Sequence, residues 1–136
     1  MASIRLDGAM PAVKPIHIVD DDVDYLRAME RLLVVHGLQV RAFSSAEEFQ
    51  AQADPDNASC VILDIHLGTA SGIDVLLGLV QSGVTTPIVI VTASDSESVR
   101  LAAIQGGCGA YLQKPVSARV LLDVLRSVAG VEIKPR

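Results

Sequence analysis

Five short segments with the composition of β-strands alternate along the chain with segments of helical periodicity. The strand-like segments are 16–19, 38–43, 60–63, 88–91 and 111–112. Between them, apolar residues recur at steps of three and four, which is typical of helices. Strands and helices in alternation form a parallel sheet covered by helices on both faces, with right-handed crossovers. The sequence therefore predicts an α/β fold of five strands and five helices.

Capping residues mark where the predicted helices begin and end. Ser94 lies three residues before Glu97, the spacing of a capping box, and Gly37 is a natural C-terminal stop. The predicted helices are 23–36, 45–53, 71–83, 94–105 and 117–128. In the third helix, the residues expected to face the core are Ile73, Leu76, Leu77 and Val80. In the last helix they are Val120, Leu121, Val124, Leu125 and Val128.

The length of 136 residues suits one domain with its own core. We expect this domain to span residues 15–130, flanked by tails at 1–14 and 131–136. Half of the residues are hydrophobic, yet there are only two Phe, two Tyr and no Trp, so the core should be aliphatic. The formal net charge of −5 suits nucleic acid poorly, since nucleic acid favours basic surfaces. We therefore expect no direct nucleic-acid binding.

Cys60 and Cys108 are the only cysteines of the chain, and they form no Cys-x-x-Cys pair that would indicate zinc or redox chemistry. Both adjoin apolar runs, which predicts buried, reduced thiols and a cytoplasmic location. Residues 1–14 show no signal-peptide pattern. No apolar run approaches the ~18 residues that cross a membrane, so we expect no membrane association.

Polar side chains follow four of the five predicted strands. They are Asp20, Asp21 and Asp22 after the first, Asp64 after the third, Thr92 after the fourth and Lys114 after the fifth. Taken alone, Asp64 would be interpreted as the cap of the next helix, because Asp is common at caps. In a parallel sheet, however, all carboxyl ends lie at one edge, where ligands bind. Gly68 and Gly72 would then let the backbone come close to Asp64 and its ligand.

Carboxylates gathered at one edge repel each other, and a divalent cation relieves that repulsion. Oxygen donors without His or Cys in the motif favour Mg²⁺. Lys114 adds a positive charge and Thr92 a hydroxyl, so the edge has the groups that stabilise a phosphoryl group in transfer. With Asp64 as nucleophile, the product would be an acyl phosphate.

These motifs resemble the receiver domain of response regulators in bacterial two-component signalling, over residues 15–130. The matching residues are the acidic pair Asp20-Asp21, the phosphorylated aspartate Asp64, the pair Thr92-Ala93, the aromatic switch residue Tyr111 and the pair Lys114-Pro115. The resemblance implies a flavodoxin-like, doubly wound sheet in the order 2-1-3-4-5. It also implies a cis peptide bond between Lys114 and Pro115.

The resemblance further implies a role for each site residue. Asp21 and Asp64 would bind Mg²⁺ directly, Asp20 largely through water, and the backbone carbonyl of His66 would be a further ligand. Asp22 is either part of the acidic group or a charge at the helix N-terminus, and the helix charge is favoured.

The sequence departs from the family pattern at two places. Leu67 and Gly68 stand where Met-Pro is usual, and Gly107-Cys108 stands where Gly-Ala is usual. The side chain of His66 would lie near the mouth of the site, as a residue that tunes water access or as a solvated loop residue.

The expected function is that of a phosphorylation switch. A sensor histidine kinase or phosphotransfer protein would phosphorylate Asp64, Thr92 and Tyr111 would move inward, and the surface of the fourth helix, fifth strand and fifth helix would change for a partner or for homodimerisation. Two alternatives remain. One is a haloacid-dehalogenase-type phosphatase with Asp20 as nucleophile, although the acidic pair that this family has after its lysine is missing. The other is a degenerate receiver that only binds partners.

Overall fold

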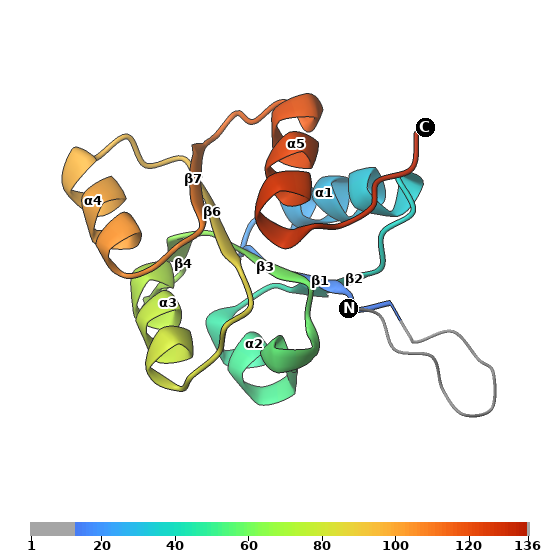
Figure 1. The fold of residues 1–136 in the computed structure, drawn as a ribbon. Coiled ribbons are helices and arrows are strands. Elements are labelled where there is room, and N and C mark those ends of the chain that lie inside the picture. The colour runs from blue at the N-terminus through green and yellow to red at the C-terminus, as the bar shows by residue number, and fades with distance from the viewer. Residues whose placement is uncertain (1–12, 136) are drawn as a thin grey trace.

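The computed structural model describes residues 13–135, so most of the predicted N-terminal tail lies outside the described residues. Its main sheet has five parallel strands in the order β2-β1-β3-β6-β7, which is the order 2-1-3-4-5 when the five are counted along the chain (Figure 1). These strands are β1 (Ile16–Val19), β2 (Val40–Phe43), β3 (Cys60–Leu63), β6 (Ile88–Thr92) and β7 (Ala110–Gln113). The predicted fold class is confirmed.

Five α-helices connect the strands and cover both faces of the sheet. They are α1 (Val23–Val35), α2 (Ala46–Gln52), α3 (Gly72–Gln81), α4 (Glu97–Gln105) and α5 (Ala118–Ala129), with one 3-10 turn, η1 (Pro55–Asn57). In Figure 1, α1 and α5 lie on one side of the sheet and α2 and α3 on the other. No helix among residues 13–135 is long and apolar enough to cross a membrane.

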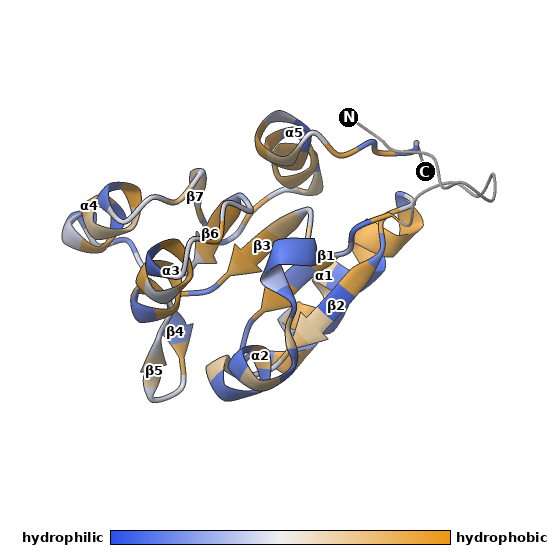
Figure 2. Cartoon of the chain, turned by 60° about the horizontal axis from the view of Figure 1, so that its bottom comes forward, coloured by the Kyte–Doolittle hydropathy of each residue, from blue (hydrophilic) through white to orange (hydrophobic). Residues whose placement is uncertain are grey.

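The three central strands, β1, β3 and β6, are buried on both faces, and their side chains alternate between two apolar clusters. Figure 2 shows the central strands as mostly hydrophobic. The α1/α5 side contains Ile16, Ile18, Cys60, Ile62, Val89 and Val91. The α2/α3/α4 side contains Val19, Val61, Leu63, Ile88 and Ile90. The core is largely aliphatic. Its two phenylalanines, Phe43 and Phe49, pack edge-on against each other, and the ring of His17 packs edge-on against Phe49 and at a tilt against Phe43.

Several predicted caps are present. Ser45, Ser71 and Ser117 cap α2, α3 and α5, each through its side-chain oxygen. The predicted cap of α4 is wrong, because Ser96 and not Ser94 accepts the hydrogen bond that starts the helix, from the amide of Val99. The hydroxyl of Ser94 instead accepts from the amide of Ser96, and Ser94 lies three residues before the helix begins.

Three residues predicted to face the core are exposed. Leu77 and Val80 of α3 are 36% and 44% exposed, and Val120 of α5 is 46% exposed. Val75 and Leu122 are buried in their place. The apolar residues of α3 surround much of the helix, so periodicity alone could not orient it. Cys60 is buried as predicted, whereas Cys108 is only half-buried.

Two features of the described chain were not predicted. After β3, the strands β4 (His66–Leu67) and β5 (Ala70–Ser71) form a small antiparallel hairpin. After α5, Val131 and Ile133 pack against the α1/α5 cluster. The amide of Lys134 donates to the carbonyl of His36, 2.9 Å away, and the carbonyl of Lys134 lies 2.7 Å from Nδ1 of the same histidine.

Candidate functional site

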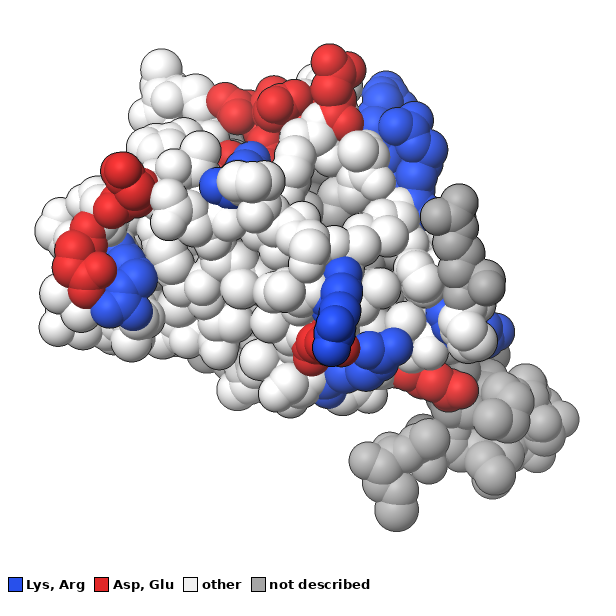
Figure 3. All heavy atoms as spheres, turned by 90° about the horizontal axis from the view of Figure 1, so that it is seen from above, with Lys and Arg blue, Asp and Glu red and all other residues white. Residues whose placement is uncertain are grey.

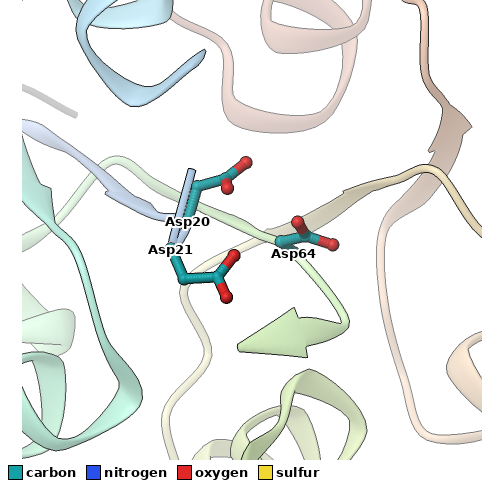
Figure 4. A group of neighbouring side chains, drawn as sticks. All are labelled: Asp20, Asp21 and Asp64. Carbon is teal, nitrogen blue, oxygen red and sulfur yellow. The ribbon is translucent and has the colours of Figure 1, made fainter. Parts of the chain in front are cut away.

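The register of the sheet brings three aspartates together. Val19 is paired with Leu63 across β1 and β3, so the residues that follow them, Asp20 and Asp64, leave the sheet at the same level. Figure 4 shows Asp20 and Asp21 at the end of β1 and Asp64 opposite them at the end of β3. Each of the three carboxylates has an oxygen within 4.8 Å of an oxygen of the others. The predicted convergence of the acidic pair with Asp64 is therefore present in the structure.

Lys114 reaches this group from the end of β7. Its Nζ donates to Oδ2 of Asp20 at 2.8 Å and to Oδ2 of Asp64 at 3.2 Å. Asp20 is 2% exposed and its second oxygen accepts from the amide of Asp22 at 2.9 Å. Both oxygens of Asp20 therefore accept hydrogen bonds from the protein, and the carboxylate is held in one position.

The β4–β5 hairpin holds the other two aspartates from the opposite side. The amide of Gly68 donates to Oδ2 of Asp21 at 2.9 Å, and the amide of His66 donates to Oδ1 of Asp64 at 3.2 Å. Gly68 has a φ of +66°, a backbone conformation that glycine adopts readily. The sequence predicted a close backbone approach here but not this contact with Asp21.

Gly72 is the place of closest backbone approach. A Cβ at this position would overlap the carbonyl oxygen of Asp64 and the backbone of Ile65. The amide of Gly72 donates to the carbonyl of Ile65 at 2.7 Å. The first residue of α3 therefore supports the backbone that carries Asp64, and only glycine fits there.

The charges of the site are strongly coupled. Burial raises the pKa of Asp20, and hydrogen bonds from Lys114 and from the backbone of Asp22 oppose that rise only in part. Burial acts to lower the pKa of Lys114, but its hydrogen bond to Asp20 and the charges of Asp20 and Asp64 outweigh burial, so the pKa of Lys114 is raised. Lys114 is therefore a permanent cation at neutral pH and offsets the repulsion between the carboxylates.

The ends of β6 and β7 contribute the remaining predicted residues. Thr92 is fully buried, and its Oγ1 accepts from the amide of Ser94 at 3.3 Å. Its carbonyl accepts from the amide of Lys114 at 2.7 Å, and the peptide bond between Lys114 and Pro115 is cis. The hydroxyl of Tyr111 is buried and finds no hydrogen-bond partner within residues 13–135. Burial raises the pKa of Tyr111.

Two residues beside the acidic pair have structural positions of their own. Asp22 caps α1, because its Oδ1 accepts from the amide of Tyr25 at 3.1 Å. The ring of Tyr25 lies against the site, with its centroid 4.0 Å from Nζ of Lys114. Sequence reasoning missed Tyr25, and the only signal for it was an aromatic residue in the first helical turn after the acidic pair. The side chain of His66 is exposed.

A family model shows to which family the chain belongs. The model described as the response regulator receiver domain matches residues 16–126, which is most of the chain. The chain belongs to the response regulator receiver family. Phosphorylation-based switching is general to receiver domains of two-component response regulators, and they generally bind Mg²⁺ at an acidic pocket. The described residues of this chain contain an acidic cluster, formed by Asp20, Asp21 and Asp64.

Individual relatives agree with this assignment. The chain is 33% identical over 117 residues to nodulation protein W of Bradyrhizobium diazoefficiens, covering 86% of this chain and 51% of that protein. A CheY-like receiver domain protein from Methanospirillum hungatei aligns with a TM-score of 0.78 at 27% identity, covering 85% of this chain and 93% of its own. A response regulator of Burkholderia pseudomallei, solved with a phosphorylated aspartic acid, calcium ion and citrate, aligns with a TM-score of 0.75 at 25% identity, covering 87% of this chain and 69% of its own. The chain spans about half the length of the curated relatives it matches.

Receiver membership leaves the two alternative functions without support. A phosphatase would need Asp20 as nucleophile, yet Asp20 is the most buried of the three aspartates. A degenerate receiver would not need the intact group of aspartates, threonine and lysine that the strand ends bring together.

Proposed function

We propose that Asp64 accepts a phosphoryl group from the phosphohistidine of a sensor histidine kinase or phosphotransfer protein. The observation that carries this proposal is the position of the Asp64 carboxylate, at the end of β3, 3.2 Å from the Lys114 ammonium and within 4.8 Å of two further carboxylates. An oxygen of Asp64 would attack phosphorus, and the bond from phosphorus to the donor nitrogen would break. Because the other ring nitrogen of the phosphohistidine carries a proton in this step, the ring would leave as neutral imidazole.

The donor set of the site fits Mg²⁺, since it consists of carboxylate oxygens close enough to share one ion. Asp21 and Asp64 would hold the ion directly, Asp20 largely through water, and the backbone carbonyl of His66 would add a further oxygen. When bound, Mg²⁺ would supply positive charge opposite the phosphoryl oxygens. Asp20 holds Lys114 in place, and the amides of Gly68 and His66 orient Asp21 and Asp64.

Lys114 and Thr92 would act on the phosphoryl group itself. Lys114 would transfer its second hydrogen bond from Asp64 to a phosphoryl oxygen and so neutralise charge that develops there. Thr92 lies at the end of the adjacent strand, and its hydroxyl would donate to another phosphoryl oxygen. These movements need no large change in the backbone, because both residues already lie at the edge of the sheet that carries Asp64.

Tyr111 would carry the response to the α4-β7-α5 surface. Its buried hydroxyl has no partner within the described residues, and an unsatisfied buried hydroxyl costs about 1–3 kcal/mol. This cost keeps the observed side-chain position close in free energy to alternatives, so a small displacement of Thr92 can shift the population. The altered surface would bind a partner or a second copy of the chain.

Phosphorylation by a small donor tests the proposal directly. The protein is incubated with Mg²⁺ and acetyl phosphate, and the adduct is located by tandem mass spectrometry. We expect an adduct on Asp64 that requires Mg²⁺ and is absent from Asp64→Asn. Asp56→Asn, a change at an exposed aspartate of η1, serves as the matched control and should be labelled normally. An adduct on Asp20, or labelling that survives in Asp64→Asn, would refute the assignment.

A further inference from the structure

The ammonium of Lys114 has three neighbours in the structure, and only two of them belong to the acidic group. Oδ2 of Asp20 and Oδ2 of Asp64 accept its hydrogen bonds at 2.8 and 3.2 Å. The third neighbour is the ring of Tyr25, whose centroid lies 4.0 Å from Nζ. A cation at this distance from the face of an aromatic ring is attracted by the negative charge of that face. The ring therefore binds the ammonium on a side where no carboxylate binds it.

The position of Tyr25 follows from the cap of α1. Oδ1 of Asp22 accepts from the amide of Tyr25 at 3.1 Å, which places Tyr25 in the first turn of the helix. Its ring is half-buried and packs against the apolar cluster between α1, α5 and the sheet. An aromatic side chain has few rotatable bonds, so packing on one side leaves the ring with little freedom. The ring of Tyr25 is thus held in a nearly fixed position beside the flexible side chain of Lys114.

A neighbour with a fixed position matters because Lys114 has to exchange one hydrogen-bond acceptor for another during phosphoryl transfer. Lysine carries its charge on a flexible stem with four carbons, and water competes for the charge at the mouth of a site. The side chain of Lys114 is 17% exposed, whereas the carboxylate-bearing side chains of Asp20 and Asp64 are 3% and 7% exposed. When Lys114 releases Asp64 for a phosphoryl oxygen, the ring remains as a neighbour that does not change. It therefore limits the positions that the ammonium can adopt.

We propose that Tyr25 is a positioning residue that holds the Lys114 ammonium over the site while the lysine exchanges Asp64 for the phosphoryl group. This inference rests on the proposed phosphorylation of Asp64. It assigns the aromatic ring, and not the tyrosine hydroxyl, as the part that acts. Tyr25→Phe should therefore behave like the natural protein, and Tyr25→Leu, which keeps apolar bulk but has no ring, should not.

The first measurement tests the geometry without phosphorylation. Protons that lie over the face of an aromatic ring resonate upfield, so the ε-methylene protons of Lys114 should be shifted upfield in NMR spectra of lysine-labelled protein. We expect the upfield shift in the natural protein and in Tyr25→Phe, and its loss in Tyr25→Leu. A Lys114 signal that is the same in all three proteins would overturn the proposal. Urea unfolding of each variant shows that the comparison is made between folded proteins.

The second measurement separates positioning from metal binding. The rate of Asp64 phosphorylation by acetyl phosphate is measured against Mg²⁺ concentration for the same three proteins. We expect Tyr25→Leu to lower the maximal rate by about threefold to thirtyfold, the range of cation–π interactions, and to leave the Mg²⁺ concentration at half-maximal rate unchanged. A changed half-maximal concentration with an unchanged maximal rate would refute the role of Tyr25, as would equal loss in Tyr25→Phe.

The two measurements also distinguish this inference from the proposed function. If the natural protein takes no phosphoryl group on Asp64, the proposed function is wrong, and the role of Tyr25 in phosphoryl transfer is wrong with it. If the natural protein is phosphorylated and Tyr25→Leu reacts at the same rate, only the inference about Tyr25 is wrong.

Discussion

The two halves of the site edge differ in how firmly their side chains are held. At the ends of β1 and β3, each aspartate of the cluster accepts a hydrogen bond from a backbone amide, and Asp20 and Asp64 also accept from Lys114. At the ends of β6 and β7, the side chain of Thr92 accepts a single hydrogen bond of 3.3 Å, and the buried Tyr111 hydroxyl has no partner within residues 13–135.

The helices that flank the two halves differ in the same way. Three residues of α1 are buried, whereas Ala103 is the only buried residue of α4. Leu101 and Ile104 of α4 are 44% and 46% exposed. The comparison indicates that the ends of β1 and β3 present a preorganised set of oxygens. The side chains at the ends of β6 and β7 are held loosely enough to change position in response to phosphorylation. Each prediction below tests one side of this comparison.

The largest effect should come from Gly72, which supports the backbone of Asp64 at the end of β3. Gly72→Ala would drive a Cβ into the backbone of Asp64, so we expect a loss of about 3 kcal/mol in the free energy of unfolding. Gly78→Ala is the matched control in the same helix, because a Cβ there meets nothing within 4 Å. That change should stabilise the protein by about 1 kcal/mol, since alanine is the better helix former. Urea unfolding checks both, and equal effects would contradict the close approach at Gly72.

The second prediction concerns α4 and β7, where the side chains are held less firmly. The amides of α4 and β7 should exchange with solvent at least about tenfold faster than the amides of β1 and β3, because few buried contacts oppose local opening there. Native-state hydrogen exchange followed by NMR measures this difference. The amides of α5, which has three buried leucines, provide the internal control. Uniform protection across all strands and helices would remove the distinction between the two halves.

The third prediction concerns His17 of β1 and tests how the free energy of unfolding changes in acid. Burial lowers the pKa of His17 from its ordinary value of 6.5, the charge of Arg41 lowers it further, and Asp54 opposes both. The folded state therefore resists protonation of His17, and the unfolded state does not. The contribution of His17 to stability should be constant above pH about 6.5 and fall below it, by up to about 1.4 kcal/mol per pH unit.

His17→Leu provides the comparison for this pH dependence. Leu fills a similar volume beside Phe43 and Phe49 and cannot be protonated. The variant should lose the part of the pH dependence that lies just below pH about 6.5. Urea unfolding at a series of pH values measures it. The same slope in both proteins would assign the acid sensitivity to other groups.

The smallest effect should come from Tyr111. Tyr111→Phe removes a buried hydroxyl that has no partner within the described residues, so we expect a gain of about 1 kcal/mol in stability. Tyr25→Phe is the matched control for the loss of a tyrosine hydroxyl. Thermal unfolding of both variants provides the measurement. A loss of stability in Tyr111→Phe would mean that the hydroxyl is satisfied, and the argument for a loosely held switch residue would lose its main support.

Much of this organisation could be predicted from the sequence, because it follows from patterns that are local. The strands and the convergence of Asp20, Asp21, Asp64 and Lys114 depend on short apolar runs and on the polar residues that end them. The order of the strands, in contrast, was implied by the family resemblance and not by a local pattern. The start of α4 could not be predicted, since Ser94 and Ser96 are both good caps. Glu97, which was expected to complete the capping box, instead pairs with Arg100 at 2.7 Å.

The remaining features depend on tertiary contacts that no local pattern reports. The contact of Tyr25 with Lys114 joins residues 89 positions apart, from 25 to 114. The donation from Gly68 to Asp21 depends on a hairpin whose strands have two residues each. The distribution of charged side chains over the surface also depends on the tertiary structure. Among the described residues visible in Figure 3, basic side chains stand in separate groups, several with acidic side chains beside them.

The segment after α5 has a practical consequence for anyone who shortens or fuses this chain. Val131 and Ile133 cover the α1/α5 cluster, and Lys134 is bound to His36 at the end of α1. A side chain at Gly37 would collide with that of Lys134, so the two segments fit closely there. A cut after Gly130 would therefore uncover apolar surface and leave the end of α1 without its partner. A junction placed beyond residue 134 keeps this contact, and the domain with it.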